Sequence, residues 1–202
     1  AGTTAPERAL IEAHPDLFSS FALLPQAEER LRELALISHT LPDVFLSAPR
    51  SFAYLRCSKG LSSLELFRSW TQRGGSWDEF VQGAEDPVAA EFLAWDGAAA
   101  EVSATKYEES SGGLLPRPTA ELVRATHDLP GLVEGLERGE CEPVPMELTL
   151  AVHRTAVGVV TTRIDPKVAD LLEALRSNPG PVPEELRPAL DTLESAGLIR
   201  YT

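Results

Sequence analysis

The sequence predicts an α+β fold, in which a mainly α-helical N-terminal domain precedes a small winged-helix-like C-terminal domain. Two changes of pattern carry this prediction. Apolar residues between positions 87 and 104 recur every three or four residues, which is typical of a helix with one buried face. From Met146 the spacing shortens to two residues, with Leu148, Leu150 and Val152 on one face, as in a half-buried strand.

The composition is that of a globular protein with an acidic surface. The 202 residues are 43% hydrophobic, and 18 Lys and Arg against 31 Asp and Glu give a formal net charge of −13. Such a charge disfavours nucleic acid and anionic membranes, and favours basic or polar partners. Cys57 and Cys141 form no CxxC pattern, so we expect two free thiols in a cytoplasmic protein. No apolar run approaches the roughly 20 residues of a membrane span.

The first domain, residues 1–125, is predicted to consist of helices. The strongest signal is Asp86-Pro87, a capping residue followed by proline at the first helical position, which opens a helix to about Lys106. Shorter helices are expected around 6–14, after Pro25, over 62–73 and over 77–81, whereas 41–60 reads as a loop with short helical turns. Their aromatic residues are expected to form the core: Phe67, Trp70, Trp77, Phe80, Phe92 and Trp95.

The middle of the chain contains turn-forming residues that are typical of a domain boundary. Residues 108–118 are rich in glycine, serine and proline, which indicates a loop. A short helix over 118–127 and a turn over 128–131 are expected next. We predict a linker over 126–145 that joins the helical domain to a C-terminal domain over 146–202.

The C-terminal domain is predicted as a β-hairpin, two helices and a short last strand. The two hairpin strands are separated by residues 154–156, which lack Asn-Gly chemistry, so a longer loop or a bulge near Gly158 is expected. Asp165-Pro166 opens the first helix, Glu184-Glu185 opens the second, and Gly197 ends it. This order of elements indicates a small winged-helix-like unit.

No catalytic, cofactor-binding or metal site is predicted. The four histidines fall at no metal-ligand spacing, and the GxSxG, Walker and GxGxxG motifs do not occur. A DNA-binding helix over 186–195 would present Arg187 against Asp191 and Glu194, which repel phosphate. A DNA-binding regulator is therefore a less favoured alternative than an acidic inhibitor or immunity-type protein that binds a basic partner. An enzyme with no recognisable motif is the least favoured reading.

The hairpin and the helix after it suggest a peptide-binding surface. An extended peptide can pair with an exposed strand edge when an apolar helix lies beside that edge. The candidate residues divide into two groups. The edge comprises Val157, Val159, Thr161 and Arg163, and the helix wall comprises Val168, Leu172 and Leu175.

Two parts of the sequence resemble a known group of proteins. GVVTTRIDPKVADLLEAL with VPEELRPALDTLESAGLI resembles the leader-binding winged-helix-like domains of ribosomal peptide modification, the RiPP recognition elements. FRSWTQRGGSWDEFVQ followed by PVAAEFLAWDGAAAEVSA is similar to accessory partner proteins of multinuclear non-heme iron-dependent oxidative enzymes, such as the methanobactin partner.

This resemblance implies a non-catalytic subunit that binds a precursor peptide and docks on an iron-dependent modifying enzyme as a heterodimer. It implies no cofactor in this chain, because the iron belongs to the partner enzyme.

Overall fold

The computed structural model describes residues 44, 47–107, 115–178, 180 and 183–201. The segment Val44–Thr202 groups into one compact unit. Its fold is α+β, as predicted, with helices packed against small antiparallel sheets. The helices expected around 6–14 and after Pro25 lie outside the described residues.

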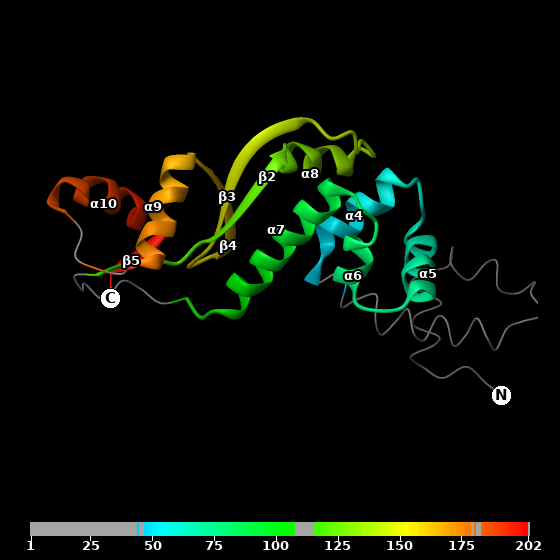
Figure 1. The fold of residues 1–202 in the computed structure, drawn as a ribbon, viewed down its shortest axis with the longest axis horizontal. Coiled ribbons are helices and arrows are strands. Elements are labelled where there is room, and N and C mark those ends of the chain that lie inside the picture. The colour runs from blue at the N-terminus through cyan, green and yellow to red at the C-terminus, as the bar shows by residue number, and fades with distance from the viewer. Residues whose placement is uncertain (1–43, 45–46, 108–114, 179, 181–182, 202) are drawn as a thin grey trace, which may run out of the picture. The chain divides into compact units, whose positions relative to one another are not determined.

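The helices and strands follow one another closely along the chain (Figure 1). In order they are α4 (Pro49–Ser58), α5 (Ser63–Arg73), α6 (Trp77–Gln82), α7 (Pro87–Ala104), β1 (Pro116–Pro118), β2 (Glu121–His127), α8 (Leu129–Glu137), β3 (Pro145–Thr155), β4 (Gly158–Ile164), α9 (Pro166–Ser177), the 3-10 turn η2 (Glu184–Leu186), α10 (Arg187–Ser195) and β5 (Ile199–Tyr201).

The predicted helices of the first half begin at their own capping residues. In α5 and α6 the hydroxyl of the serine before the helix accepts from the amide of a glutamate three residues on. The carboxylate of that glutamate accepts in turn from the serine amide. In α7 the Asp86 carboxylate accepts from the amides of Val88 and Ala89. Residues 49–58, expected as loop and short turns, instead form the ten-residue helix α4.

Aromatic rings fill the space between these helices, as expected. All six predicted rings are buried, and Phe52 of α4 joins them. Trp77 contacts Phe52, Trp70 and Phe80 with ring centroids 5.4–5.5 Å apart. Such pairs stabilise a core beyond the area that they bury.

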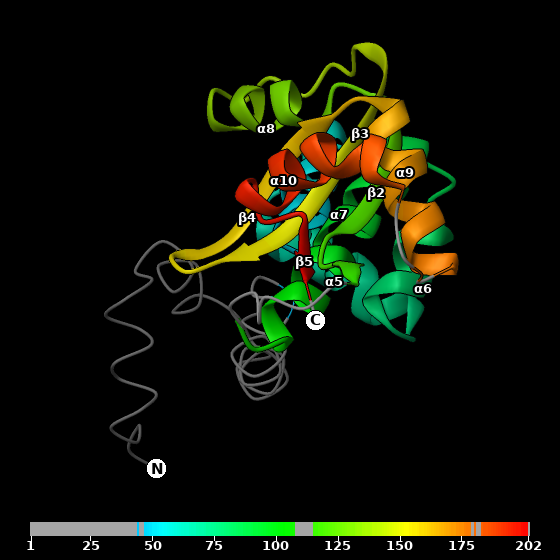
Figure 2. The ribbon, with the colours of Figure 1, turned by 90° about the vertical axis from the view of Figure 1, so that its left-hand side faces the viewer.

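A three-stranded antiparallel sheet, in the order β2-β3-β4, separates two layers of helices. Side chains of β3 alternate between the layers: Val152 pairs with Thr161, which contacts α7, whereas Ala151 packs with the leucines of α9 and α10. Figures 1 and 2 show α7 on one side of the sheet and α9, α10 and β5 on the other. Both faces of β3 are therefore buried from Leu148 to His153.

The middle of the chain differs from its prediction. Residues 121–127 form strand β2 rather than a helix, because they pair along their length with β3. The expected turn at 128–131 is the first turn of helix α8, capped by Asp128. The segment 126–145 thus contains the end of β2, all of α8 and the start of β3. Independent folding of 1–125 and 146–202, the predicted domains, stays a prediction.

The hairpin is tighter than expected. Thr155 pairs with Gly158, so only Ala156 and Val157 form the turn. Gly158 has a φ of 144°, a conformation that glycine adopts without strain, and this permits the tight reversal. Among the described residues, no helix is long and apolar enough to cross a membrane.

Candidate functional site

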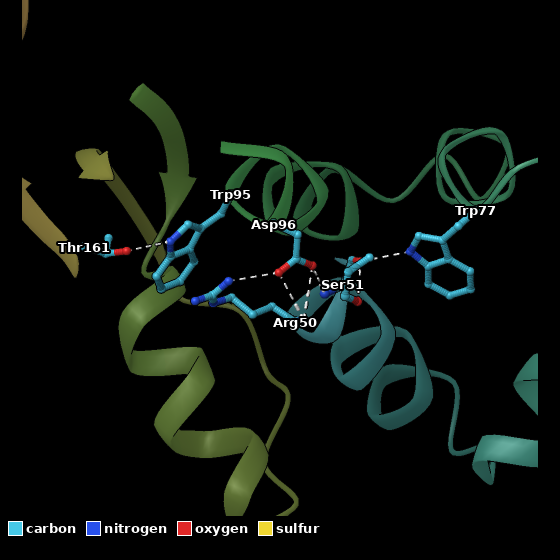
Figure 3. A network of polar contacts seen from close by, with 7 residues as sticks. Arg50, Ser51, Trp77, Trp95, Asp96 and Thr161 are labelled. Atoms are coloured by element: carbon cyan, nitrogen blue, oxygen red, sulfur yellow. Dashed lines mark hydrogen bonds and ion pairs between the residues drawn. The ribbon is translucent and has the colours of Figure 1, made fainter. Parts of the chain in front are cut away.

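A polar network connects the edge strand β4 to helices α4, α6 and α7 (Figure 3). The indole N–H of Trp95 in α7 donates to the Thr161 hydroxyl of β4 over 3.0 Å. The Arg50 guanidinium of α4 lies over the Trp95 ring, with its carbon 4.3 Å from the ring centroid. On the far side of α4, the Trp77 indole N–H donates to the Ser51 hydroxyl over 3.0 Å. The network fixes the position of β4 relative to α4 and α7.

The Asp96 carboxylate is the centre of this network. Its side chain is fully buried, and it accepts from the Arg50 guanidinium over 3.0 Å and from the Ser51 amide over 2.9 Å. The Arg50 amide also lies 3.2 Å from it. Burial raises the pKa of the Asp96 carboxyl, and the hydrogen bonds from Ser51 and Arg50 oppose that effect.

Asp96 also acts as the N-terminal cap of α4. The residue before this helix is Ala48, which has no side chain that could accept from the first amides. Arg50 and Ser51 are the second and third residues of α4, and their amides are the ones that a capping residue would normally satisfy. The cap therefore comes from α7, 45 residues further along the chain.

The outer edge of β4 presents alternate backbone groups. Thr155 and Gly158 flank the two-residue turn, so the amide and carbonyl of each bond to those of the other. Along an antiparallel pair, such hydrogen-bonded residue pairs alternate with pairs whose backbone groups do not bond to each other. In β4 the residues of these non-bonded pairs are Val159, Thr161 and Arg163, which direct their amides and carbonyls away from β3. No other strand of the described chain pairs with this edge.

A cavity of about 740 Å³ and another of about 560 Å³ border β4. The smaller one lies between β4, α4 and α7, and its lining includes Val159, Thr161 and Arg50. Four small residues of α7 form its helical wall: Ala99, Ala100, Ser103 and Ala104. We call this the β4–α7 groove. Because these side chains are short, the helix leaves room beside the strand edge.

The structure brings only part of the predicted edge together at the groove. Val159 and Thr161 line it, and Val159 is 37% exposed. Arg163 is exposed two residues further along β4 and lines the larger cavity. Val157 is 94% exposed at the tip of the hairpin turn, where it contributes to neither cavity lining.

The predicted helix wall lies on the opposite face of the sheet. Leu172 and Leu175 are buried in a core with Ala151 and the leucines of α10, and Val168 packs against that core. The physical reason is the alternation of β4, since Val159 and Thr161 point toward α7. The helix that borders the groove is therefore α7, and α9 supports the sheet from behind.

Several groove residues have no clear signal in the sequence. The alanines at the end of α7 read as an apolar stripe, and Arg50 lies in a stretch expected to be a loop. Only the small size of the residues in GAAAEVSA could have indicated a helix face that leaves space. Which strand this face borders depends on the packing.

Elsewhere in the described chain, a second polar cluster joins α7 to β2. The Glu91 carboxylate accepts from the amide and hydroxyl of Thr126 and lies 3.1 Å from His127 Nδ1. Within the part of the chain that the structure describes, no three His, Cys, Asp or Glu side chains are grouped so that they could hold a metal ion. No protein-family model and no curated protein matches this sequence.

Proposed function

We propose that this protein binds an extended acidic peptide as an additional strand on the outer edge of β4. The observation that carries the proposal is the row of outward backbone groups at Val159, Thr161 and Arg163 beside the β4–α7 groove. Backbone pairing would supply affinity, and the groove would accept alternate side chains of the peptide.

The charges beside the groove favour acidic peptides. Arg50 lines it, Arg154 of β3 donates to the carbonyl of the groove residue Ser103, and Arg163 lies further along β4. Asp96 is the acidic residue of the groove lining, and it already pairs with Arg50. Arg163 shares its cavity lining with Glu147 and Asp165, so the charge that no acidic residue of the groove lining offsets is that of Arg154. In a chain with a formal net charge of −13, this positive charge would attract a carboxylate to a defined place.

The resemblance noted in the sequence extends this proposal to a biological role. We propose a non-catalytic partner subunit that presents a ribosomally made precursor peptide to an iron-dependent modifying enzyme. The two proteins would form a heterodimer in the cytoplasm, with the iron held by the enzyme and no cofactor in this chain. The β3–β4 hairpin with α9, α10 and β5 supports a winged-helix-like description of the C-terminal part.

Proline at position 159 tests strand addition. Peptides of about 12 residues that bind the full chain would be selected from a display library, and one would be followed by fluorescence anisotropy. Val159→Pro removes one outward amide and should weaken binding about tenfold or more, whereas Val159→Ala keeps the amide and should change it less than about threefold. Circular dichroism would establish that both variants fold.

A second pair of variants tests the groove itself. Ala100→Trp fills the space beside Thr161, whereas Ala94→Trp adds the same ring at an exposed position of α7 outside the groove lining. Only the first should abolish binding, and binding to wild type should weaken with added salt. Selected peptides that bind Val159→Pro and Ala100→Trp as tightly as wild type would refute the assignment.

The partner role is tested separately. Any iron-dependent enzyme found to be encoded beside this gene would be assayed on its precursor peptide with and without this protein. Modification should require the protein and should fall with Val159→Pro. An enzyme that modifies its peptide equally fast alone would refute the partner role, while the anisotropy result would still decide peptide binding.

A further inference from the structure

Two hydrogen bonds fix where helix α7 lies along the edge strand β4. Near the middle of the helix, the Trp95 indole N–H donates to the Thr161 hydroxyl over 3.0 Å. About two turns further on, the Ser103 carbonyl accepts from the Arg154 guanidinium over 2.6 Å, and Arg154 pairs across the sheet with Val159. The part of α7 between these two contacts therefore borders the β4 edge from Thr161 to Val159.

The wall of the β4–α7 groove between the two contacts is apolar. Ala99 and Ala100 line it, and Ala104 extends it toward the end of the helix. The two charged residues of the lining, Arg50 and Asp96, already form an ion pair with each other. A polar side chain placed against the alanine methyl groups would lose water without gaining a hydrogen bond, whereas an aliphatic side chain gains by leaving water.

The Ser103 end of the groove differs, because a positive charge lies there. Arg154 donates to the Ser103 carbonyl, and within the described chain it forms an ion pair with no carboxylate. A carbonyl is a neutral acceptor, so the guanidinium keeps its full charge and has further N–H groups that can donate to an anion. Its planar fork matches the two oxygens of a carboxylate. An acidic side chain is therefore the natural complement to this end of the groove.

We propose that the bound peptide is recognised through two side chains two residues apart, a large aliphatic one over Ala99 and Ala100 and an acidic one beside Arg154. This inference rests on the proposed strand addition and names the kind of peptide that it selects. Residues paired across neighbouring strands point to the same face, whichever way the added strand runs. Peptide residues opposite Thr161 and Val159 would both point toward α7, and the residue between them would point away.

The aliphatic side chain is tested on the wild-type protein first. Peptides selected from the display library against the full chain should share a large aliphatic residue and an acidic residue with one position between them. Either order of the two residues agrees with the inference, because a strand can add in either direction. In a selected peptide followed by fluorescence anisotropy, alanine at the aliphatic position should weaken binding about tenfold or more.

A larger side chain at position 100 should change the size preference. Ala100→Leu occupies the space over the helix, so it should weaken binding of the selected peptide about tenfold. The peptide with alanine at the aliphatic position should bind Ala100→Leu at least as tightly as it binds wild type. Ala94→Leu, at an exposed position of α7 outside the groove lining, should alter neither affinity. An equal loss for both peptides on Ala100→Leu would contradict the assignment of this wall.

The acidic side chain is tested by changing both partners of the expected ion pair. Glutamine in place of the acidic residue should weaken binding to wild type about threefold or more and reduce its salt dependence. Arg154→Gln should weaken the acidic peptide by a similar factor and leave the glutamine peptide unchanged, and Arg154→Lys should restore part of the loss. A merely structural effect of losing the Ser103 hydrogen bond would weaken both peptides equally.

The outcomes separate this inference from strand addition. Selected peptides without the aliphatic and acidic spacing, or an equal loss of both peptides on Arg154→Gln, would overturn the inference. If those peptides still lose affinity for Val159→Pro, strand addition stands and only the recognition is wrong. If no peptide binds the wild-type chain, both proposals fail. The sequences selected on wild type decide the matter even where a variant fails to fold.

Discussion

Replacing Asp96 by alanine should destabilise the fold by about 3–5 kcal/mol. The change removes the acceptor of the Arg50 and Ser51 amides at the start of α4, and each buried amide left without a partner costs about 1–3 kcal/mol. It also removes the counterion of the Arg50 guanidinium, whose side chain is 29% exposed. Because Arg50 borders the groove, water can replace part of this contact, which favours the lower half of the range.

Urea denaturation followed by tryptophan fluorescence measures this cost. Asp96→Asn keeps the side-chain volume and one acceptor oxygen, so it should cost about 1–3 kcal/mol. Glu101→Ala, which removes an exposed carboxylate from the same helix, should stay within about 0.5 kcal/mol of wild type. The dependence of unfolding free energy on urea concentration should have the same slope in all variants, so that a shift of the urea midpoint reports a change in stability. A cost below about 1 kcal/mol for Asp96→Ala would refute the capping role of this carboxylate.

Three further changes test the packing. Burial lowers the pKa of His153, so the unfolded chain binds a proton more readily than the folded protein does. The free energy of unfolding should therefore be highest above about pH 6.5 and decline as the pH falls toward the folded-state pKa. In urea denaturation, His153→Asn should make the midpoint depend less on pH. Gly197→Ala should cost about 1–2 kcal/mol of stability, because Gly197 has a φ of 75° and the new Cβ would lie 3.3 Å from His153 Nδ1. Gly97→Ala, in α7 with no atom near the new Cβ, should instead stabilise the protein by about 0.5–1 kcal/mol. Equal effects of the two changes would contradict the strain at Gly197. Trp95→Phe and Thr161→Val should each destabilise the protein, with a coupling of about 0.5–1.5 kcal/mol in a double-mutant cycle; strict additivity would show that their hydrogen bond contributes nothing.

The helices that begin at local signals could be predicted from the sequence. Ser76, Asp86 and Asp165 each cap the helix expected after them, and in each case the side chain accepts from an amide within three residues. Because both partners lie in one short segment, the sequence contains the whole interaction. The start of α4 could not be predicted in this way, because its capping residue, Asp96, lies 45 residues further along the chain.

Strand β2 shows where local propensity fails. ELVRATH contains good helix formers, and a helix was expected there. Its pairing with β3, and the burial of Val123 and Ala125, decide the outcome instead. These pairs join residues 18 to 31 positions apart, so a short window of sequence cannot show them.

Peptide binding at the candidate residues stays a prediction, and the structure shows only where they lie. Val159, Thr161 and Arg163 lie on the outer edge of β4 with their backbone groups directed outward. Leu172 and Leu175 of α9 lie in the core on the other face of the sheet, so α9 does not border this edge as expected. An apolar helical stripe shows that a helix is buried on one side, and it does not show against which surface.

The capping of α4 by Asp96 of α7 also affects how the protein folds. The first turn of α4 lacks a local acceptor, so it cannot close stably until α7 has formed and the intervening chain has been looped back, at an entropic cost. Helix α7, with its own Asp86, has no such dependence. The amides of Arg50 and Ser51 should accordingly exchange with solvent through openings that free Asp96, so that their protection reports the docking of the two helices rather than the helicity of α4.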